Sequence, residues 1–252
     1  MKSILVTGAA QGIGYAIAQR FACAGWRVGL FDLNVERCEQ HARSPEFPNA
    51  VAGFCDVTSR DSVEQALQQF LEATEGRLDV LVNNAGVLSA GAFADMSPAQ
   101  INAMISVNIQ GLTNVAHVAF PALRDTPGAV MVNLCSSSSI HGIQWLAVYS
   151  ASKFYVNGLT QALNIEWEPF DIHVVSIKPP AINTSMGHAL DERHLAKMKI
   201  ANEPDDVADA VWSAVHRRPQ HVLIGGATKV WYWLTKLLPA PAAKRLMKLL
   251  VD

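Results

Sequence analysis

Ile4-Leu5-Val6-Thr7-Gly8-Ala9-Ala10-Gln11-Gly12-Ile13-Gly14 is the stretch that most directly indicates the fold of this chain. A short apolar run enters a glycine-rich turn, and residues 15–22 then follow the periodicity of a helix. Strand, glycine turn and helix in this order are typical of a dinucleotide-binding site. Gly8 would allow the tight turn, Gly12 the approach of a pyrophosphate to the backbone, and Gly14 the close packing of helix on strand. The strand and helix patterns on either side argue against the alternative, a merely flexible glycine loop.

Asp32 ends the next apolar run and lies 18 residues after Gly14. A carboxylate at this distance is expected to accept hydrogen bonds from the adenosine ribose hydroxyls of a dinucleotide. It would also repel a 2′-phosphate, and no lysine or arginine follows it at once, because the next residues are Leu33, Asn34 and Val35. The sequence therefore favours NAD over NADP. In the alternative interpretation, Asp32 only caps a helix that starts near Asn34.

Tyr149 and Lys153 are four residues apart in a segment with helical periodicity. Their side chains are therefore expected one turn apart on the same face of a helix. A neighbouring ammonium favours the phenolate, so we expect the pKa of the tyrosine to fall from about 10 towards neutrality. A general acid or base works best when its pKa lies near the operating pH. The pair predicts a proton donor or acceptor, although many surface helices carry the same two residues at this spacing.

Taken together, these features resemble the short-chain dehydrogenase/reductase family, over about residues 2–225. Further motifs of the family follow in order. Asp56 resembles the family's acid in the adenine pocket, and residues 83–86 resemble its N-N-A-G segment. Asn108 resembles the structural asparagine of its catalytic tetrad. The tetrad serine of the family lies 13 residues before the tyrosine, which is Ser136 here. It belongs to a run of four serines, in which Ser138 is the next candidate.

The resemblance implies hydride transfer between NAD and a secondary alcohol or ketone. Tyr149 would move the proton at the substrate oxygen, Ser136 would orient that oxygen, and Lys153 would also hold the nicotinamide ribose. The implied catalytic residues are Asn108, Ser136, Tyr149 and Lys153. The implied cofactor-binding residues are Thr7, Gly8, Gln11, Gly12, Ile13, Gly14, Asp32, Leu33, Asp56, Val57, Asn83, Ala85, Gly86, Tyr149, Lys153, Pro179, Ile182 and Thr184. One departure from the family pattern is Pro180, which stands where a glycine usually follows Pro179 and lacks a backbone donor.

Apolar runs alternate with amphipathic segments along the chain, which predicts an α/β fold. We expect a doubly wound Rossmann fold whose seven-stranded parallel sheet has helices on both faces. The expected strands span 3–7, 27–31, 50–55, 78–82, 128–134, 171–177 and 220–224, and notable helices span 59–75, 98–124 and 148–167. Several candidate site residues fall at strand ends, where ligands bind in such sheets. Half of the 252 residues are hydrophobic, which suits one sizeable domain.

Composition narrows the possible partners. The net charge is −2, which gives no reason to expect nucleic-acid binding. The four cysteines lack C-x-x-C or histidine spacing, so we expect free thiols in a reducing compartment and no metal site. No secretory signal and no apolar run of membrane-spanning length are visible, so a cytoplasmic location is expected. The resemblance further implies a homodimer or a homotetramer.

Residues 1–226 are expected to form the NAD-binding catalytic domain, with a substrate lid at about 183–202, followed by an amphipathic extension over 227–252. For segment 228–250 we favour a subunit interface or a flap over the substrate cleft, and the alternative is peripheral attachment to a membrane. Apolar residues near the lid favour a lipophilic substrate. The main alternative to an oxidoreductase is a catalytically silent dinucleotide-sensing or scaffold protein of the same fold. An epimerase or dehydratase that recycles its NAD would need a larger substrate domain.

Overall fold

A computed structural model describes residues 1–188, 202–239, 241–242 and 245. Seven strands within these residues form one sheet in the order β3-β2-β1-β4-β5-β6-β7, and all neighbouring strands are parallel. The strands are β1 (Ser3–Thr7), β2 (Arg27–Asp32), β3 (Ala50–Phe54), β4 (Val80–Asn83), β5 (Val130–Leu134), β6 (His173–Lys178) and β7 (His221–Leu223). The predicted seven-stranded parallel sheet is confirmed.

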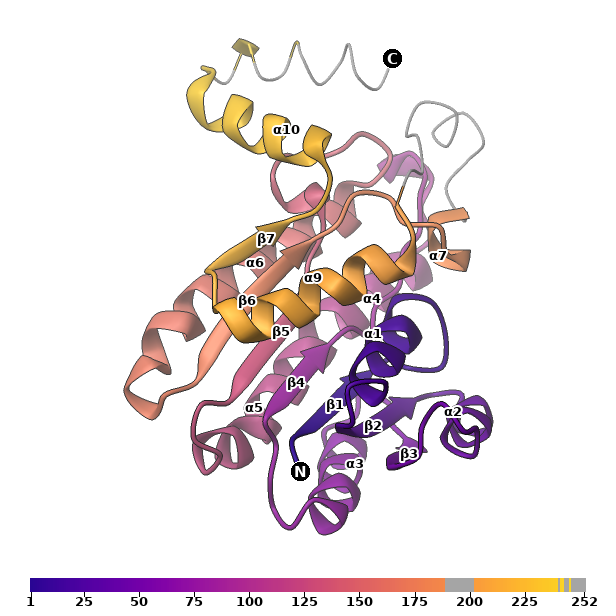
Figure 1. The fold of residues 1–252 in the computed structure, drawn as a ribbon. Helices are drawn as coiled ribbons and strands as arrows, with labels where there is room; N and C mark the ends of the chain where they lie inside the picture. The colour runs from indigo at the N-terminus through magenta and orange to yellow at the C-terminus, as the bar shows by residue number, and fades with distance from the viewer. Residues whose placement is uncertain (189–201, 240, 243–244, 246–252) are drawn as a thin grey trace.

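Helices cover both faces of this sheet (Figure 1). The helices are α1 (Gly12–Ala22), α2 (Val35–Ala42), α3 (Arg60–Ala73), α4 (Pro98–Ile105), α5 (Leu112–Arg124), α6 (Ala147–Glu166), α7 (Ser185–His188), α9 (Pro204–Arg217) and α10 (Gly226–Leu237). α1, α2 and α9 pack on one face, and α3, α5 and α6 pack on the other. Successive strand residues point to opposite faces, so Ile4 and Val6 join the layer of α1, whereas Leu5 joins the other layer. Both faces of each strand are therefore apolar, as expected for a parallel sheet.

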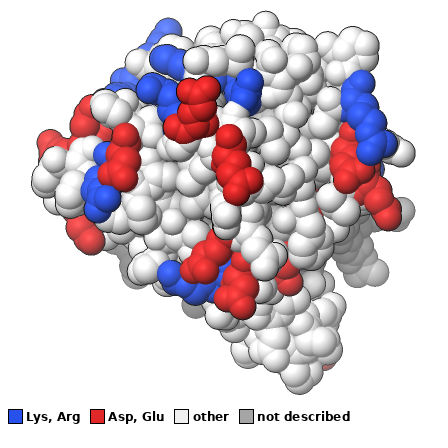
Figure 2. All heavy atoms as spheres, turned by 90° about the horizontal axis from the view of Figure 1, so that it is seen from below, with Lys and Arg blue, Asp and Glu red and all other residues white. Residues whose placement is uncertain are grey.

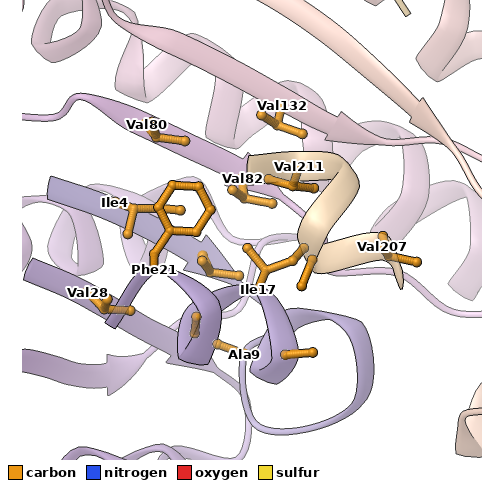
Figure 3. Close-up of a cluster of buried hydrophobic side chains, with 14 of the residues drawn as sticks. Ile4, Ala9, Ile17, Phe21, Val28, Val80, Val82, Val132, Val207 and Val211 are labelled. Carbon is orange, nitrogen blue, oxygen red and sulfur yellow. The ribbon is translucent and has the colours of Figure 1, made fainter. Parts of the chain in front are cut away.

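The core beneath α1 and α9 holds the glycine turn in place. Ile17 and Phe21 of α1 lie against Ile4 of β1, and Val207 and Val211 of α9 close the same cluster (Figure 3). All five side chains are fully buried. Burial of one side chain of this size contributes about 1.5–3 kcal/mol. α1 is thereby fixed with its amino end at the carboxyl end of β1.

The helix predicted over 98–124 is interrupted in the structure. α4 passes into a π-helical segment, Ser106–Gly111, before α5 begins. Gly111 allows this segment to approach the loop after β3, because a Cβ there would lie 2.5 Å from Cγ2 of Val57. The wider turn places Asn108 in the interior. Short π segments of this kind are frequent at functional sites.

The chain changes direction across the sheet between β1 and β4. β2 and β3 lie on one side of β1, whereas β5, β6 and β7 continue on the far side of β4. The loops that leave β1 and β4 therefore separate and open a crevice at the carboxyl edge, which is where open α/β sheets bind ligands.

The surface at the opposite end carries mixed charge. Figure 2 shows Lys and Arg side chains beside Asp and Glu side chains, without a large patch of one sign. Near the amino end of β1, Arg77 pairs with Asp79 and Arg124 pairs with Asp125. Among the described helices, none combines the length and the apolar character needed to cross a bilayer.

Candidate active site

A crevice of about 330 Å³ lies at the carboxyl edge of the sheet. Most of the predicted site residues line it: Gly8, Gln11, Gly12, Ile13, Asp32, Leu33, Asp56, Val57, Ala85, Gly86, Ser136, Tyr149, Lys153, Pro179, Ile182 and Thr184. The other four, Thr7, Gly14, Asn83 and Asn108, lie outside this lining. Segments that are far apart in the sequence thus meet in one place.

The glycine turn leaves the amino end of α1 open towards the crevice. Gly8 and Gly12 have φ values of +68° and +59°, which favour glycine over residues with a side chain. At Gly14 a Cβ would lie 2.1 Å from the carbonyl oxygen of Gly8, so only glycine fits there. Gln11 occupies the N-cap of α1, and its side chain makes no capping hydrogen bond. The first backbone N–H groups of α1 therefore remain available to an anion such as a pyrophosphate.

Asn84, to which the sequence motifs assign no role, holds this turn in shape. Asn84 donates from Nδ2 to the carbonyl oxygens of Thr7 and Gly8, at 3.0 and 2.9 Å. The Thr7 hydroxyl donates to the carbonyl of Val82 and accepts from the backbone N–H of Asn84. Asn83, by contrast, faces the interior, where its amide nitrogen donates to Asn133. Thr7, Asn83 and Asn84 thus brace the sheet and the turn; the signal for Asn84 was its place beside Asn83 in the N-N-A-G segment.

Asp32 is held rigidly beside the glycine turn. Its Oδ2 accepts from the backbone N–H of Ala10 at 3.0 Å, and its Oδ1 accepts from the N–H of Asn34 at 3.0 Å. Asn34 itself is the N-cap of α2 and accepts from the N–H of Arg37. Helix capping therefore belongs to Asn34, and Asp32 does not serve as the cap. Its carboxylate lines the crevice next to Leu33.

Asp56 forms the next part of the same wall. Its Oδ1 accepts from the backbone N–H and the hydroxyl of Thr58, at 2.9 and 2.7 Å. Its backbone N–H donates to the hydroxyl of Ser62 on α3. The loop after β3 is therefore fixed by its own side chains, and it presents Asp56 and Val57 to the crevice.

Ser136, Tyr149 and Lys153 meet on the opposite side of the crevice. Ser136 follows β5, and the other two side chains project from α6. The hydroxyl of Ser136 hydrogen-bonds the phenol of Tyr149 and lies 3.2 Å from the hydroxyl of Ser138. The Nζ of Lys153 lies 5.5 Å from the centre of the Tyr149 ring. The predicted spacing on one helix face is thus observed.

The expected pKa of Tyr149 is wrong in direction for the protein without ligand. Burial raises the pKa of the phenol from its ordinary value to about 12, against the lowering effect of the hydrogen bond with Ser136. The ammonium of Lys153 donates to the carbonyl of Leu134 at 2.9 Å. Burial also lowers the pKa of Lys153. Both groups lie on one helix face, but Lys153 is not among the groups that act on the Tyr149 pKa, in which burial is the largest contribution.

Asn108 supports this cluster from behind. Its Oδ1 accepts from the backbone N–H of Val87, and its Nδ2 donates to the carbonyl of Val87, both at 2.8 Å. Nδ2 also lies 3.2 Å from the hydroxyl of Ser152 on α6. Asn108 therefore ties the loop after β4 to the helix that carries Tyr149 and Lys153.

The loop after β6 closes the crevice from above. The carbonyl of Pro179 accepts from the N–H of Ser137 at 2.9 Å, which keeps the serine run in register despite Pro180. Thr184 packs close to the glycine turn, since a Cβ on Gly12 would lie 3.3 Å from its Cγ2. Ile182 and Asn202 form an isolated bridge, which joins the two ends of the predicted lid. The rest of the lid, residues 189–201, lies outside the described residues.

These residues fit a nicotinamide dinucleotide. The open amino end of α1 suits a pyrophosphate, and the fixed carboxylate of Asp32 suits ribose hydroxyls. At the other end of the crevice, the ammonium of Lys153 and the hydroxyls of Ser136 and Tyr149 suit the reacting groups. Within the described part of the chain, no group of three His, Cys, Asp or Glu side chains is placed to hold a metal ion.

Comparison with known proteins agrees with this geometry. A family profile described as "short chain dehydrogenase" matches residues 2–195. The chain is 30% identical over 227 residues to an uncharacterized oxidoreductase of Staphylococcus aureus, covering 90% of this chain and 96% of that protein. It is 34% identical over 189 residues to D-threitol dehydrogenase of Mycolicibacterium smegmatis, covering 74% and 72%. The crystal structure of a 3-ketoacyl-(acyl-carrier-protein) reductase from Brucella melitensis complexed with NADH superposes with a TM-score of 0.80 at 26% identity, covering 90% and 98%.

Proposed function

The chain belongs to the short-chain dehydrogenase/reductase family, and from this premise we propose that it interconverts a secondary alcohol and a ketone with NAD. The observation that carries the proposal is the meeting of Ser136, Tyr149 and Lys153 with the glycine turn in one crevice. A sensor or scaffold of the same fold would need the turn but not these three side chains together.

Proton transfer is the task of the protein in such a reaction. A bound nicotinamide would supply or accept the hydride. Tyr149 would give a proton to the ketone oxygen, or remove it from the alcohol, while Ser136 donates a hydrogen bond to the same oxygen. A raised pKa keeps Tyr149 protonated at neutral pH, which suits the donor role in ketone reduction. A positioned acid or base of this kind is typically worth about 10²–10⁴ in rate.

The preference for NAD rests on Asp32. Two backbone N–H groups fix its carboxylate at the edge of the crevice, so it cannot readily turn away from a cofactor. A 2′-phosphate at that position would meet an unshielded negative charge. The ribose hydroxyls of NAD would instead donate to the carboxylate.

A lipophilic substrate is supported by the walls around the reacting groups. Leu88, Leu146 and Met186 line the crevice on the side of Tyr149 and the lid. Apolar walls with a few placed polar groups are typical of small-molecule sites.

The test is the appearance of NADH absorbance with a panel of secondary alcohols, including sugar alcohols, steroids and hydroxyacyl thioesters. Tyr149→Phe is expected to lower kcat by about 10²–10⁴ and to leave NADH binding, followed by its fluorescence, largely unchanged. Tyr155→Phe is the matched control, because Tyr155 lies on the same helix and its hydroxyl contacts Thr113 instead. Normal turnover by the Tyr149→Phe variant would refute the mechanism. NADH binding without turnover of any alcohol or ketone would favour the sensor.

A further inference from the structure

Lys178, the last residue of β6, is buried without a hydrogen-bond partner among the described residues. Only 3% of its surface is exposed. The comparably buried Lys153 differs, because its ammonium donates to the carbonyl of Leu134. Its Nζ is not among the fully buried polar atoms that lack a partner, which are on Asn83 and Asn157 in the described residues, so it keeps a small exposed area that a ligand can reach. The proton chemistry at Tyr149 gives the ammonium of Lys178 no role.

Two further basic side chains surround the same place. The Nζ atoms of Lys178 and Lys236 lie 5.5 and 4.5 Å from the centre of the Tyr232 ring, and the ring of His221 lies 5.2 Å from it. Cation–π contact with Tyr232 offsets part of the burial cost. It does not remove the repulsion between the two lysines, and Lys236 helps to lower the pKa of Lys178.

A balancing carboxylate is missing from the described surroundings. Burial lowers the pKa values of both Lys178 and His221, and no Asp or Glu acts on either of them. The sequence itself holds seven Lys and Arg and no Asp or Glu between Asp209 and Asp252. The cluster of Lys178, Lys236 and His221, which we call the basic cluster, thus has an excess of positive charge that an anion would neutralise.

The basic cluster adjoins the candidate active site. Pro179, which follows Lys178 directly, lines the crevice and accepts a hydrogen bond from Ser137. Cys135 also lines the crevice, and its thiol, which donates to the carbonyl of Lys153, lies close enough to act on the pKa values of Lys178, Lys153 and Tyr149. α10, which carries Tyr232 and Lys236, lies over the end of β7 in Figure 1. Its Trp231 contacts His141, in the loop that leads to α6.

We propose that the basic cluster binds the anionic group of the substrate, a carboxylate or a phosphate, while the alcohol or ketone of the same molecule reaches Tyr149. This inference rests on the proposed oxidoreductase function and specifies its substrate class: a lipophilic hydroxy or keto compound with an acidic end. The anion would accept from the Nζ of Lys178 and relieve the repulsion from Lys236. It would also orient the substrate along the crevice.

The anion site is tested first without a substrate, by thermal unfolding in inorganic phosphate or acetate against sodium chloride of equal ionic strength. A saturable rise in Tm is expected for the natural protein, because a ligand that binds only the folded state stabilises it. Lys178→Met should abolish the rise. Lys236→Gln, at an exposed position that tolerates replacement, should weaken it. Lys229→Met is the matched control, since Lys229 lies on the exposed side of α10, and it should retain the rise.

The substrate role is tested with pairs of hydroxy acids and their methyl esters, followed by NADH formation. The KM for an acid should rise about 10–100-fold in Lys178→Met, as expected for a lost hydrogen bond to a charged group, while the KM for its ester stays unchanged. If acids and esters are oxidised with equal KM and phosphate has no saturable effect, the basic cluster is not an anion site, and the proposed function remains intact. A phosphate effect without turnover of any compound would overturn the substrate role together with the proposed function. Binding to phosphatidylglycerol vesicles that needs Lys178, without any response to soluble phosphate, would assign a lipid headgroup instead and overturn the substrate role.

Discussion

Asp32 is the residue on which cofactor choice is expected to depend. Asp32→Asn keeps the size of the side chain but removes the charge that faces the crevice. We expect kcat/KM for NAD to fall about 10-fold or more, because hydrogen bonds to a charged group are worth about 1.5–3 kcal/mol. The same change should raise kcat/KM for NADP, since the repulsion of the 2′-phosphate is removed. The measurement is the ratio of kcat/KM for the two cofactors.

Asp61→Asn is the control for this prediction, because Asp61 is exposed in the first turn of α3 and does not line the crevice. It should leave the cofactor ratio unchanged. An Asp32→Asn variant with the ratio of the natural protein would show that cofactor choice is set elsewhere.

Tyr149 has a second property that can be measured, its ionisation in the protein without cofactor. Burial raises its pKa to about 12, so the phenol stays protonated through the neutral range. A free tyrosine ionises near pH 10. The unfolded chain therefore releases this proton first, and the stability contributed by Tyr149 is lost as the pH rises from about 10 to about 12. Ultraviolet difference titration of the natural protein against Tyr149→Phe should show no phenolate from this residue below pH 10. Ionisation near neutrality would contradict the burial effect.

At the scale of elements, the turn between β1 and α1 depends on Gly14. A methyl group there would lie 2.1 Å from the carbonyl oxygen of Gly8, which is backbone and cannot move aside. Gly14→Ala is therefore expected to abolish NADH binding and to lower Tm. Gly158→Ala is the matched control within α6, where a Cβ would meet nothing within 4 Å. It should leave binding unchanged and stabilise the protein by about 0.5–1 kcal/mol, as alanine is the better helix former. Equal NADH affinity in both variants would refute the packing argument.

The π segment between α4 and α5 is held by the side chain of Asn108. Asn108→Ala removes hydrogen bonds to Val87 and Ser152 and leaves the partly buried backbone groups of Val87 without this partner. The free energy of unfolding should fall by about 2–4 kcal/mol, in proportion to the three hydrogen bonds lost. Asn102→Ala, at an exposed position of α4, should change it by less than about 0.5 kcal/mol. Denaturant unfolding of the two variants decides the matter, and equal stability would show that Asn108 does not brace the loop.

The elements that could be predicted from sequence are those whose pattern is local. Strands with apolar residues on both faces appear as apolar runs, so all seven were located within one to two residues of their observed ends. The interruption of the helix over 98–124 was missed, because it depends on contacts of Asn108 with Val87 and of Gly111 with Val57. These partners are distant in sequence, and helical periodicity depends only on neighbouring residues, so it cannot predict these contacts. The pKa of Tyr149 was missed for the same reason, since burial is a property of the assembled site.

α10 has one face against the body of the protein and one exposed apolar face. Its inner face, with Thr228, Trp231 and Tyr232, is at least partly buried against the body of the protein. Its outer face exposes Val230, Trp233 and Leu237. The predicted amphipathic character of the extension is thus present in the described part. Exposed apolar side chains in a row are typical of a surface that contacts another surface.

For the whole molecule, the parallel sheet separates two apolar layers, and the thiols follow this division. Cys38 and Cys55 are buried in opposite layers, Cys135 is buried near α6, and Cys23 is exposed. Free thiols were predicted from the lack of any spacing pattern, whereas their burial depends on which face each segment presents. Cys38 is thus closed off in the interior, whereas Cys55 and Cys135 are buried at the wall of the crevice, and all four cysteines are free thiols.

The thiols also make the stability of the whole molecule depend on pH in the alkaline range. Burial raises the pKa values of Cys38 and Cys55 from 9.0 to about 12, with a smaller contribution from nearby carboxylates. Between pH 9 and pH 12 the unfolded chain therefore binds fewer protons than the folded protein, and stability falls as the pH rises. The loss should approach about 1.4 kcal/mol per pH unit for each thiol. Denaturant unfolding at several pH values should show this slope, and Cys38→Ala should make it shallower.

The exposure of the thiols can be measured by labelling. An aromatic disulfide reagent near pH 8 should label one thiol of the native protein, Cys23, and all four after unfolding. Rapid labelling of Cys38, which is fully buried and does not line the crevice, would show that the interior opens far more readily than its packing indicates.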